Sequence, residues 1–376
     1  MDFDESPELR TLRAVARDVA EAAAGRYPDP RPDAETVWSA ITGQGWSGLG
    51  VPELHGGSAA ELTALAVVSA ECARAGLPST LRSTLAAGLL VDRFGSDDQR
   101  GRWLPRLTGG AAATTCLAGP AQLVGSLIAG EPGAVPDLDV AEFVVVVLPQ
   151  AESGRPDDRP SGTWRMCVLD PAIEQTRLSS SVSGRPIGRV LAGDLAPGQL
   201  DVGPPLDNRD AELAADLLAA LTAADLVGAA DGLLARTVRH VCTREQFGRP
   251  LGAFQAVQHH VADMASELEG ARLLVDEALT RLTDGEPAHR EVSAAKAYAG
   301  RAATAVSLLS HQLHGGIGYV TESRLYLLSQ RVESDALLAG TAAEHLDELA
   351  ERYRRRPGRT LELDALDGGR REVAMP

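Results

Sequence analysis

Lysine and cysteine are both scarce in this 376-residue sequence. Lys296 is the single lysine, and the other basic residues are arginines. We interpret this as a compositional bias, and it excludes most lysine-based chemistry. The four cysteines are far apart and form no CxxC pair, which argues against a zinc site and against a disulfide framework. A reducing, cytoplasmic setting is the simplest interpretation. The cysteines are Cys72, Cys116, Cys167 and Cys242.

Positive charge is also in short supply, with 36 basic against 52 acidic residues and a formal net charge of −16. Such a surface repels phosphate backbones and anionic lipid, so nucleic-acid binding is not expected as the main function. A local basic pocket for a small anion remains compatible with this charge. No apolar run reaches the roughly 18–20 residues of a membrane span, and the densest is Phe143–Leu148. The acidic start MDFDESPELR lacks the layout of a secretory signal.

What is present divides the chain into three parts, and the first predicts helices. Ser6 and Pro7 form a typical N-cap and first-turn pair. Apolar residues follow at helical spacing, beginning with Leu9 and Leu12. Further helices are predicted over 33–42, 59–75, 79–94 and 97–107, with Gly76 placed to end the third of the five.

The second part is rich in proline and contains short apolar runs bounded by turn residues. These runs have the length of strands and predict a small β-domain. The stretch 150–162 is expected to be an exposed hairpin loop. The runs are 112–117, 143–148, 164–169 and 187–191.

The third part returns to long helical periodicity. Helices are expected over 210–242, from Phe254 through Leu273, and over 288–313 and 321–338, which favours an antiparallel four-helix bundle. The predicted fold class is therefore α+β. The expected domains are an N-terminal helical domain (1–110), a central β-domain (111–205), a C-terminal bundle (206–355) and a tail (356–376).

The strongest motif is TREQFGRPLGAFQAVQH, residues 243–259. Arg244 and Gln246 lie near the end of one predicted helix, and Gln255 is expected one to two turns into the next. A guanidinium fork with two amides suits a pyrophosphate. On these grounds alone, a capped and solvated helix–helix turn is the favoured explanation of the segment.

A second motif is HQLHGGIGYVTES, residues 311–323. A helix is expected to end at His314, where Gly315 and Gly316 permit close backbone approach or a glycine C-cap. His259 and His260 are adjacent on a helix and face different directions. His311 and His314 lack the carboxylate or cysteine that would complete a metal site, so no metal is predicted.

These two motifs resemble the C-terminal signatures of the acyl-CoA dehydrogenase family. GWSGLGVPELHGG (45–57) and QRGRWLPRLTGG (99–110) resemble its N-terminal signatures. The resemblance implies an oligomer that binds FAD at subunit interfaces. It implies that a glutamate removes the α-proton of an acyl thioester while flavin N5 accepts the β-hydride. An electron-transfer flavoprotein is an implied electron acceptor.

In this family, the neighbouring subunit binds the ADP end of FAD. The residues that match those binding positions are present in this sequence. The resemblance implies that Arg244, Gln246, Phe247 and Gln255 contact the phosphates and the ring edge. It implies a second adenosine-side contact from Gln312, Gly315 and Gly316.

The catalytic base of the family is missing at both positions where members carry it. Ala339 stands where many members have a glutamate before Gly-Thr, and Leu218 stands at the other position. Asp216, Glu333 and Asp335 are near in sequence but would point elsewhere on their helices. A solvated helix face is the expectation for these three carboxylates.

The β-domain departs from the family as well. ATTCLAGPAQL (113–123) replaces a segment that normally carries an acidic residue, and Trp164 lies outside the usual Gly-x-Lys context. Random decay would erode both halves of the cofactor site. Loss of the flavin-ring half with retention of the ADP half instead resembles one subunit of the α2β2 heterotetramers of this family.

Three functions stay open. The first is a subunit of a heteromeric, FAD-dependent acyl-CoA dehydrogenase that needs a homologous base-bearing partner and is inactive alone. The second is a self-sufficient homo-oligomeric dehydrogenase with a relocated base. The third is a non-redox protein that binds or cyclises acyl thioesters, or an assembly scaffold. The ligand is an acyl-CoA or acyl-carrier thioester, and lipid metabolism or a natural-product pathway is implied.

Overall fold

Five helices open the chain in the computed structural model, close to their predicted positions. They are α1 (Pro7–Gly25), α2 (Ala34–Thr42), α3 (Leu62–Ala75), α4 (Thr80–Phe94) and α5 (Asp97–Thr108). Gly76 ends α3 with a φ of 83°, and a reciprocal Ser96/Gln99 capping box starts α5. The structure describes residues 6–25, 34–117, 121–125, 127–130, 133–152, 160–170, 176–180, 186–190 and 198–354.

A six-stranded sheet follows, in the order β3-β2-β5-β6-β9, with β1 paired in parallel to β5. The side chains of β5 are buried on both faces from Phe143 to Leu148, which explains its uninterrupted apolar run. Phe143 belongs to the core shared with the helices, and Val144 belongs to a second core on the opposite face. The strands are β1 (Ala113–Leu117), β2 (Gln122–Val124), β3 (Leu127–Ala129), β5 (Phe143–Ala151), β6 (Pro160–Leu169) and β9 (Leu200–Leu206).

A smaller sheet joins β4 (Val135–Pro136), β8 (Pro186–Val190) and β7 (Thr176–Ser180). The hairpin predicted around 150–162 agrees with the antiparallel pairing of β5 with β6, in which Ala151 lies opposite Pro160. Most of its loop lies outside the described residues, and so does the predicted tail, 356–376.

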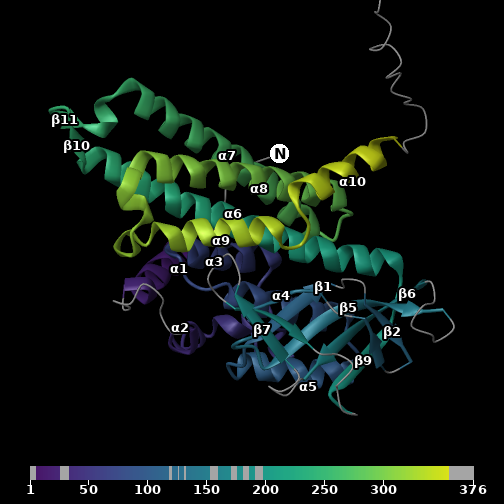
Figure 1. Ribbon diagram of the computed structural model, residues 1–376. Helices are drawn as coiled ribbons and strands as arrows, with labels where there is room; N and C mark the ends of the chain where they lie inside the picture. The colour runs from purple at the N-terminus through teal and green to yellow at the C-terminus, as the bar shows by residue number, and fades with distance from the viewer. Residues whose placement is uncertain are drawn as a thin grey trace, which may run out of the picture.

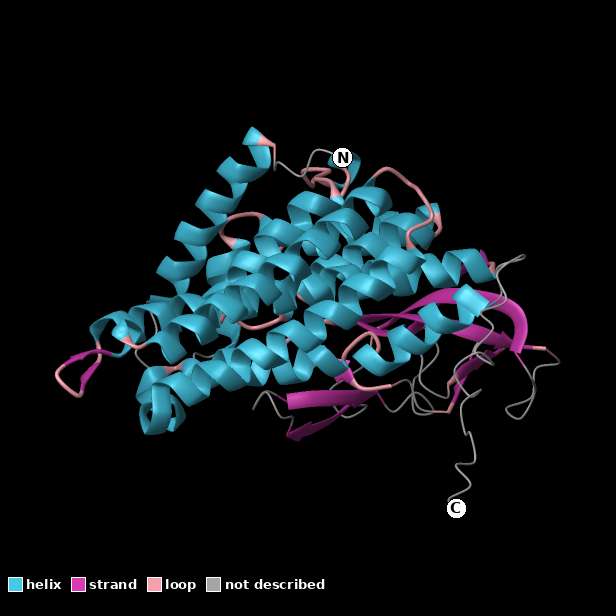
Figure 2. Ribbon diagram, turned by 90° about the horizontal axis from the view of Figure 1, so that it is seen from above, coloured by secondary structure: helices cyan, strands magenta, loops and turns pink. Residues whose placement is uncertain are grey.

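Long helices form the third layer. Figure 1 shows them lying side by side above the N-terminal helices and the strands, and Figure 2 shows the same bundle from above. A reciprocal capping box between Asp207 and Asp210 starts α6. The helices are α6 (Asn208–Thr243), α7 (Gln255–Thr283), α8 (His289–His314), α9 (Leu325–Leu337) and α10 (Ala342–Arg354). The predicted order of helices, strands and bundle is confirmed.

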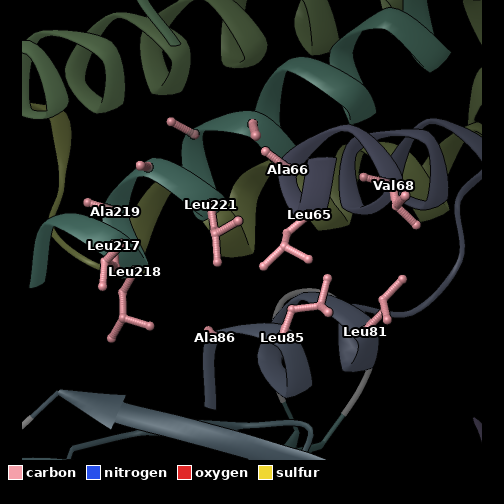
Figure 3. Packing of buried hydrophobic residues seen from close by; sticks show 14 of the residues in the cluster. Leu65, Ala66, Val68, Leu81, Leu85, Ala86, Leu217, Leu218, Ala219 and Leu221 are labelled. Carbon is pink, nitrogen blue, oxygen red and sulfur yellow. The ribbon is translucent and has the colours of Figure 1, made fainter. Parts of the chain in front are cut away.

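Two glycines let α6 cross α3 at close range. A Cβ built at Gly228 would lie 2.1 Å from the carbonyl oxygen of Ala70, and one at Gly232 would lie 2.3 Å from that of Arg74. Leucines fill the space around this crossing. Figure 3 shows Leu221 of α6 among side chains of α3 and α4. The bundle is therefore fixed directly against the N-terminal domain.

The same interface contains a buried ion cluster, which comprises Arg82, Asp225, Arg331 and Asp335. Arg82 donates to Asp335 over 2.7 Å, Arg331 donates to Asp335 over 2.8 Å, and Arg331 also binds Asp225. All four side chains are buried. Buried charges persist only when paired, so this cluster ties α4, α6 and α9 into one arrangement.

One apolar segment was not anticipated from the sequence, because aspartates interrupt its apolar run. Among the described helices, α6 is long and apolar enough to cross a membrane, with a mean hydropathy of 1.6 over its most apolar window. Yet 89% of that window is buried inside the protein. Its apolar character is explained by its central place in the bundle.

Candidate functional site

The segment after α6 forms an exposed hairpin at the end of the bundle. β10 (Glu245–Gln246) pairs with β11 (Arg249–Pro250), and the turn residues Phe247 and Gly248 have φ values of 53° and 80°. Two consecutive positive φ values are the signature of a type I′ hairpin turn. The Phe247 side chain is 91% exposed. The hairpin therefore presents an aromatic ring outward.

Arg244 caps the C-terminus of α6 and is exposed. Its guanidinium makes no hydrogen bond or ion pair with any described residue. Gln246 is exposed as well, and among the described residues its amide donates only to the neighbouring Glu245 carbonyl over 2.7 Å. Gln255 is the first residue of α7, so the expectation that it lies one to two turns into the helix was wrong. The turn 251–253 tightens the connection and delays the start of α7.

The second motif closes α8 and is equally open. Gln312 is exposed, and Gly315 has a φ of 61° with a ψ of −145°, a conformation that glycine adopts without strain. A Cβ built at Gly315 or at Gly316 would meet no atom within 4 Å. The backbone here is bare and accessible to another molecule.

The two motifs meet although they are far apart in sequence. The rings of His240, on α6, and His314, on α8, stack with centroids 4.3 Å apart and planes 19° apart. Burial lowers the pKa of His240, and the nearby His314 and Arg244 lower it further. Burial also lowers the pKa of His314. The stacked pair therefore joins the Arg244 hairpin to the Gly315–Gly316 turn.

A cavity of about 230 Å³ is lined by the N-terminal half of α6, between the helices and the sheet. Its walls come from α4, β1, residues 134–136, α6 and residues 337–339. Leu218 and Ala339 both line it. The two alternative base positions inferred from the sequence thus converge on one space. The described residues that line it include no aspartate, glutamate or histidine.

The backbone at Ala339 has an unusual conformation. Its φ is 53°, a region that residues other than glycine, asparagine and aspartate rarely adopt. The Ala339 carbonyl oxygen lies 2.9 Å from Nε2 of His345. The turn is thus shaped by the protein around it, and the Ala339 methyl group supplies no proton acceptor.

The nearby carboxylates serve other purposes. Asp216 and Asp335 are 5% and 1% exposed, so the expectation of a solvated helix face was wrong for both, while Glu333 is exposed. Asp335 is held by two guanidinium groups in the buried ion cluster. Asp216 pairs with Nδ1 of His289 over 2.7 Å. None of the three lines the 230 Å³ cavity.

Glu212, Asp216 and His289 bring potential metal-ligand atoms within 4.8 Å of one another. Glu212 and His289 lie on the wall of a second cavity, of about 990 Å³, beside Trp164. Arg352 binds Glu212 over 2.6 Å, and His289 binds Asp216. The two carboxylates are therefore already paired with cationic or polar side chains.

Sequence reasoning missed Arg82, which lines the 230 Å³ cavity from α4. The available signal was an arginine within the otherwise apolar helix TLRSTLAAGLL. A charge on a buried helix face needs a partner, but its partners lie on α6 and α9. Sequence spacing alone could not identify them.

Comparison with known proteins agrees with this architecture. The family model "Acyl-CoA dehydrogenase, N-terminal domain" matches residues 6–111, and "Acyl-CoA dehydrogenase, C-terminal domain" matches residues 214–353. Acyl-CoA dehydrogenase IpdE2 of Mycobacterium tuberculosis is 30% identical over 316 residues, covering 84% of this chain and 86% of that protein.

Two solved structures share the fold along almost the whole chain. The ChsE4–ChsE5 complex of Mycobacterium tuberculosis matches with a TM-score of 0.82 at 21% identity, covering 95% of this chain and 100% of that chain. A variant of the Tcur3481–Tcur3483 steroid acyl-CoA dehydrogenase matches with a TM-score of 0.78 at 26% identity, covering 92% and 97%.

Proposed function

This chain belongs to the acyl-CoA dehydrogenase family, and from that premise we propose that it is a subunit of a heteromeric FAD-dependent dehydrogenase of acyl thioesters. In this role it completes the ADP side of an FAD site, and a homologous partner subunit contributes the catalytic base. One observation carries the proposal. Ala339 and Leu218 line the same cavity, and no described residue lining it can accept a proton from carbon.

Proton abstraction is the step that this chain lacks. A proton α to a thioester is weakly acidic, so its removal needs a base within about 2.6–3.2 Å. The three candidate carboxylates named from the sequence are either paired in the interior or exposed, and none of them lines the cavity. This distribution weighs against a self-sufficient enzyme with a relocated base.

The end of the bundle that carries both motifs fits FAD. Members of the acyl-CoA dehydrogenase family are flavoproteins. Arg244 offers an uncommitted guanidinium suited to a phosphate. Gly315 and Gly316 offer open backbone, and Phe247 an exposed ring. Nδ1 of His311, one turn before the glycines, is buried without a hydrogen-bond partner among the described residues. When bound, FAD supplies the acceptor for the β-hydride.

The location of these residues supports a site shared between subunits. The β10–β11 hairpin projects from the end of the bundle away from the chain's own sheet (Figure 1). The 230 Å³ cavity, by contrast, lies between the bundle and that sheet. A cofactor held by Arg244 would therefore present its reactive ring to another chain.

The relatives add support for a two-chain assembly. ChsE4 and ChsE5 form a complex, and Tcur3481–Tcur3483 is a steroid acyl-CoA dehydrogenase named by two components. We extend the proposal for this chain to an α2β2 heterotetramer in the cytoplasm, with an electron-transfer flavoprotein as electron acceptor. A non-redox thioester-binding protein would explain the missing base but not the retained ADP-binding positions.

The test is purification of the full chain alone and together with a homologous chain that carries glutamate at the position of Ala339, ideally one encoded beside it. We expect visible flavin absorbance and dehydrogenation of acyl-CoA only for the pair. Bound flavin and turnover by the chain alone would overturn the proposal. A stable pair without flavin would also overturn it.

A further inference from the structure

Arg82 places a cationic group on the wall of the 230 Å³ cavity, whose other described lining residues are uncharged. Its side chain is 5% exposed. Within the described structure, its hydrogen bond to Asp335 and its ion pairs with Asp335 and Asp225 are all made through Nη1. Nε and Nη2 have no partner there, since Arg82 has no other hydrogen bond or ion pair. Most of this guanidinium is thus available to a ligand.

Thr115 of β1 is a second uncommitted donor on the same wall. It is 8% exposed, and its hydroxyl makes no hydrogen bond to a described residue. The described polar side-chain atoms that are sealed from solvent and unpaired belong to Ser310, His311 and Gln330. The free atoms of Arg82 and Thr115 are therefore reached by solvent. Both residues line the 230 Å³ cavity.

The other polar side chains of the wall are already engaged. Ser83 donates to Asp137 over 2.7 Å, Thr222 donates to the Leu218 carbonyl over 2.7 Å, and the Cys116 thiol lies 3.7 Å from the Ala134 carbonyl. Only donors remain at Arg82, because a guanidinium has no acceptor. The complementary ligand atom is thus an acceptor.

We infer that this cavity binds an acyl group that carries an oxygen acceptor, a carbonyl or a carboxylate, contacted by Arg82 and Thr115. The inference rests on the proposed function in that the ligand is an acyl thioester. A purely hydrocarbon chain would leave both donors unpaired once it displaced the water. An acyl group with an oxygen beside Arg82 and Thr115 would accept hydrogen bonds from both donors.

The surrounding charges admit either a ketone or a carboxylate. In the buried ion cluster, two arginines face two aspartates, and the ammonium of Lys296 acts electrostatically on both Arg82 and Asp335. The carboxylate of Asp137 lies behind Ser83 and accepts from the hydroxyls of Ser79, Thr80 and Ser83. A ketone and a carboxylate both provide the required oxygen acceptor, and a series of three ligands distinguishes between them.

The experiment compares three five-carbon acyl groups as pantetheine and CoA thioesters: pentanoyl, 4-oxopentanoyl and glutaryl. Binding to the full chain is measured by calorimetry. We expect at least one oxygenated ligand to bind about tenfold more tightly than pentanoyl. Preference for 4-oxopentanoyl identifies a neutral carbonyl, and preference for glutaryl identifies a carboxylate.

Thr115→Val keeps the side-chain shape and removes the hydroxyl, so it should reduce this preference without unfolding the protein. Arg82→Lys should reduce it further, with folding checked by circular dichroism. Leu337→Ala changes the same wall without removing a donor and serves as the control. Equal binding of all three ligands would overturn the inference and leave the proposed FAD role intact. Binding of none would also overturn it, while flavin in the co-purified pair would still support that role.

Discussion

The ammonium of Lys296 donates a 2.7 Å hydrogen bond to the carbonyl oxygen of Gly340. A second bond, of 3.3 Å, reaches the carbonyl of Ala336. The only lysine of the chain is therefore fully buried and clamps the backbone on both sides of Ala339. Because Ala339 lines the cavity with a strained φ, Lys296 holds the position to which the sequence resemblance assigns the base.

Lys296→Met should destabilise the protein, because it leaves two buried carbonyls without their donor. The free energy of unfolding should fall by about 1–3 kcal/mol, measured by chemical denaturation. Burial lowers the pKa of Lys296 to about 8 from 10.5. The folded protein thus releases this proton before the unfolded chain does, and wild-type stability relative to the variant should rise as the pH increases between those values. A difference that stays constant across this range would contradict this account.

The α3–α6 crossing gives a prediction with a matched control. Gly228→Ala should cost about 1–3 kcal/mol, because the added methyl group overlaps the Ala70 carbonyl. Gly300→Ala lies within α8, where a Cβ meets nothing within 4 Å. It should instead stabilise the protein by about 0.5–1 kcal/mol through helix propensity. Thermal denaturation of both variants checks the sign of each effect.

Features that depend on local patterns were predictable from the sequence. The C-terminal end of α3 at Ala75 follows from Gly76, whereas its start lies at Leu62 and not at the predicted residue 59. The apolar run 143–148 forms a strand, β5, as its length predicts. Counting along the motifs also identifies Ala339 and Leu218 as the two positions at which the resemblance implies a base, and this assignment stays a prediction. Their convergence on one cavity is consistent with that count.

Features that depend on long-range pairing were not predictable. Asp335 looked like a surface carboxylate because its partner Arg82 lies 253 residues away. The start of α7 at Gln255 depends on a short 3₁₀ turn that carries no periodic signal. The His240–His314 stack joins two motifs whose proximity only the packed bundle reveals.

This histidine stack predicts a specific response to acid. The pKa values of His240 and His314 are both lowered from 6.5 in the folded protein. As the pH falls, the unfolded chain therefore binds these protons before the folded protein does. The stack stabilises the protein above about pH 6.5, and this contribution is lost as the pH falls below that value. His240→Phe retains an aromatic ring but does not titrate. Its stability should fall less than that of the wild type between about pH 7.5 and about pH 5.5.

His289 makes the opposite contribution, because its hydrogen bond to Asp216 raises its pKa. The comparison of His240→Phe with the wild type cancels this contribution. Urea denaturation at both pH values provides the measurement. An equal loss of stability in the two proteins would mean that the stack is not a pH-sensitive contact.

Arg244→Ala should weaken retention of FAD by the assembled complex. Removal of a charge-assisted bond to phosphate costs about 1.5–3 kcal/mol. Arg244→Lys should restore retention only in part, because the ammonium cannot form the bidentate fork. Arg290→Ala removes an exposed arginine at the start of α8, away from both motifs, and is the control. The readout is the flavin absorbance per complex after gel filtration. Unchanged flavin content in Arg244→Ala would contradict the assignment of Arg244 to the FAD phosphates.

The missing base gives the last prediction. The unmutated chain alone should show negligible dehydrogenase activity, because neither Ala339 nor Leu218 can accept a proton. General-base catalysis contributes about 10²–10⁴-fold to such a step. If the rest of the site were complete, Ala339→Glu should therefore raise activity of the chain alone by a comparable factor. Leu218→Glu provides the same test from α6, which also lines the cavity.

We expect no such gain from either variant alone. The segment 113–123 lacks the acidic residue that the family places near the flavin and the substrate, so a restored base would still lack its cofactor side. Activity of the pair should be unchanged by Ala339→Glu, because the partner already carries a base. Turnover of several acyl-CoA esters, followed spectrophotometrically with an artificial electron acceptor, provides the measurement. Robust turnover by the unmutated, partner-free chain would show that a base exists elsewhere and that the subunit role is wrong.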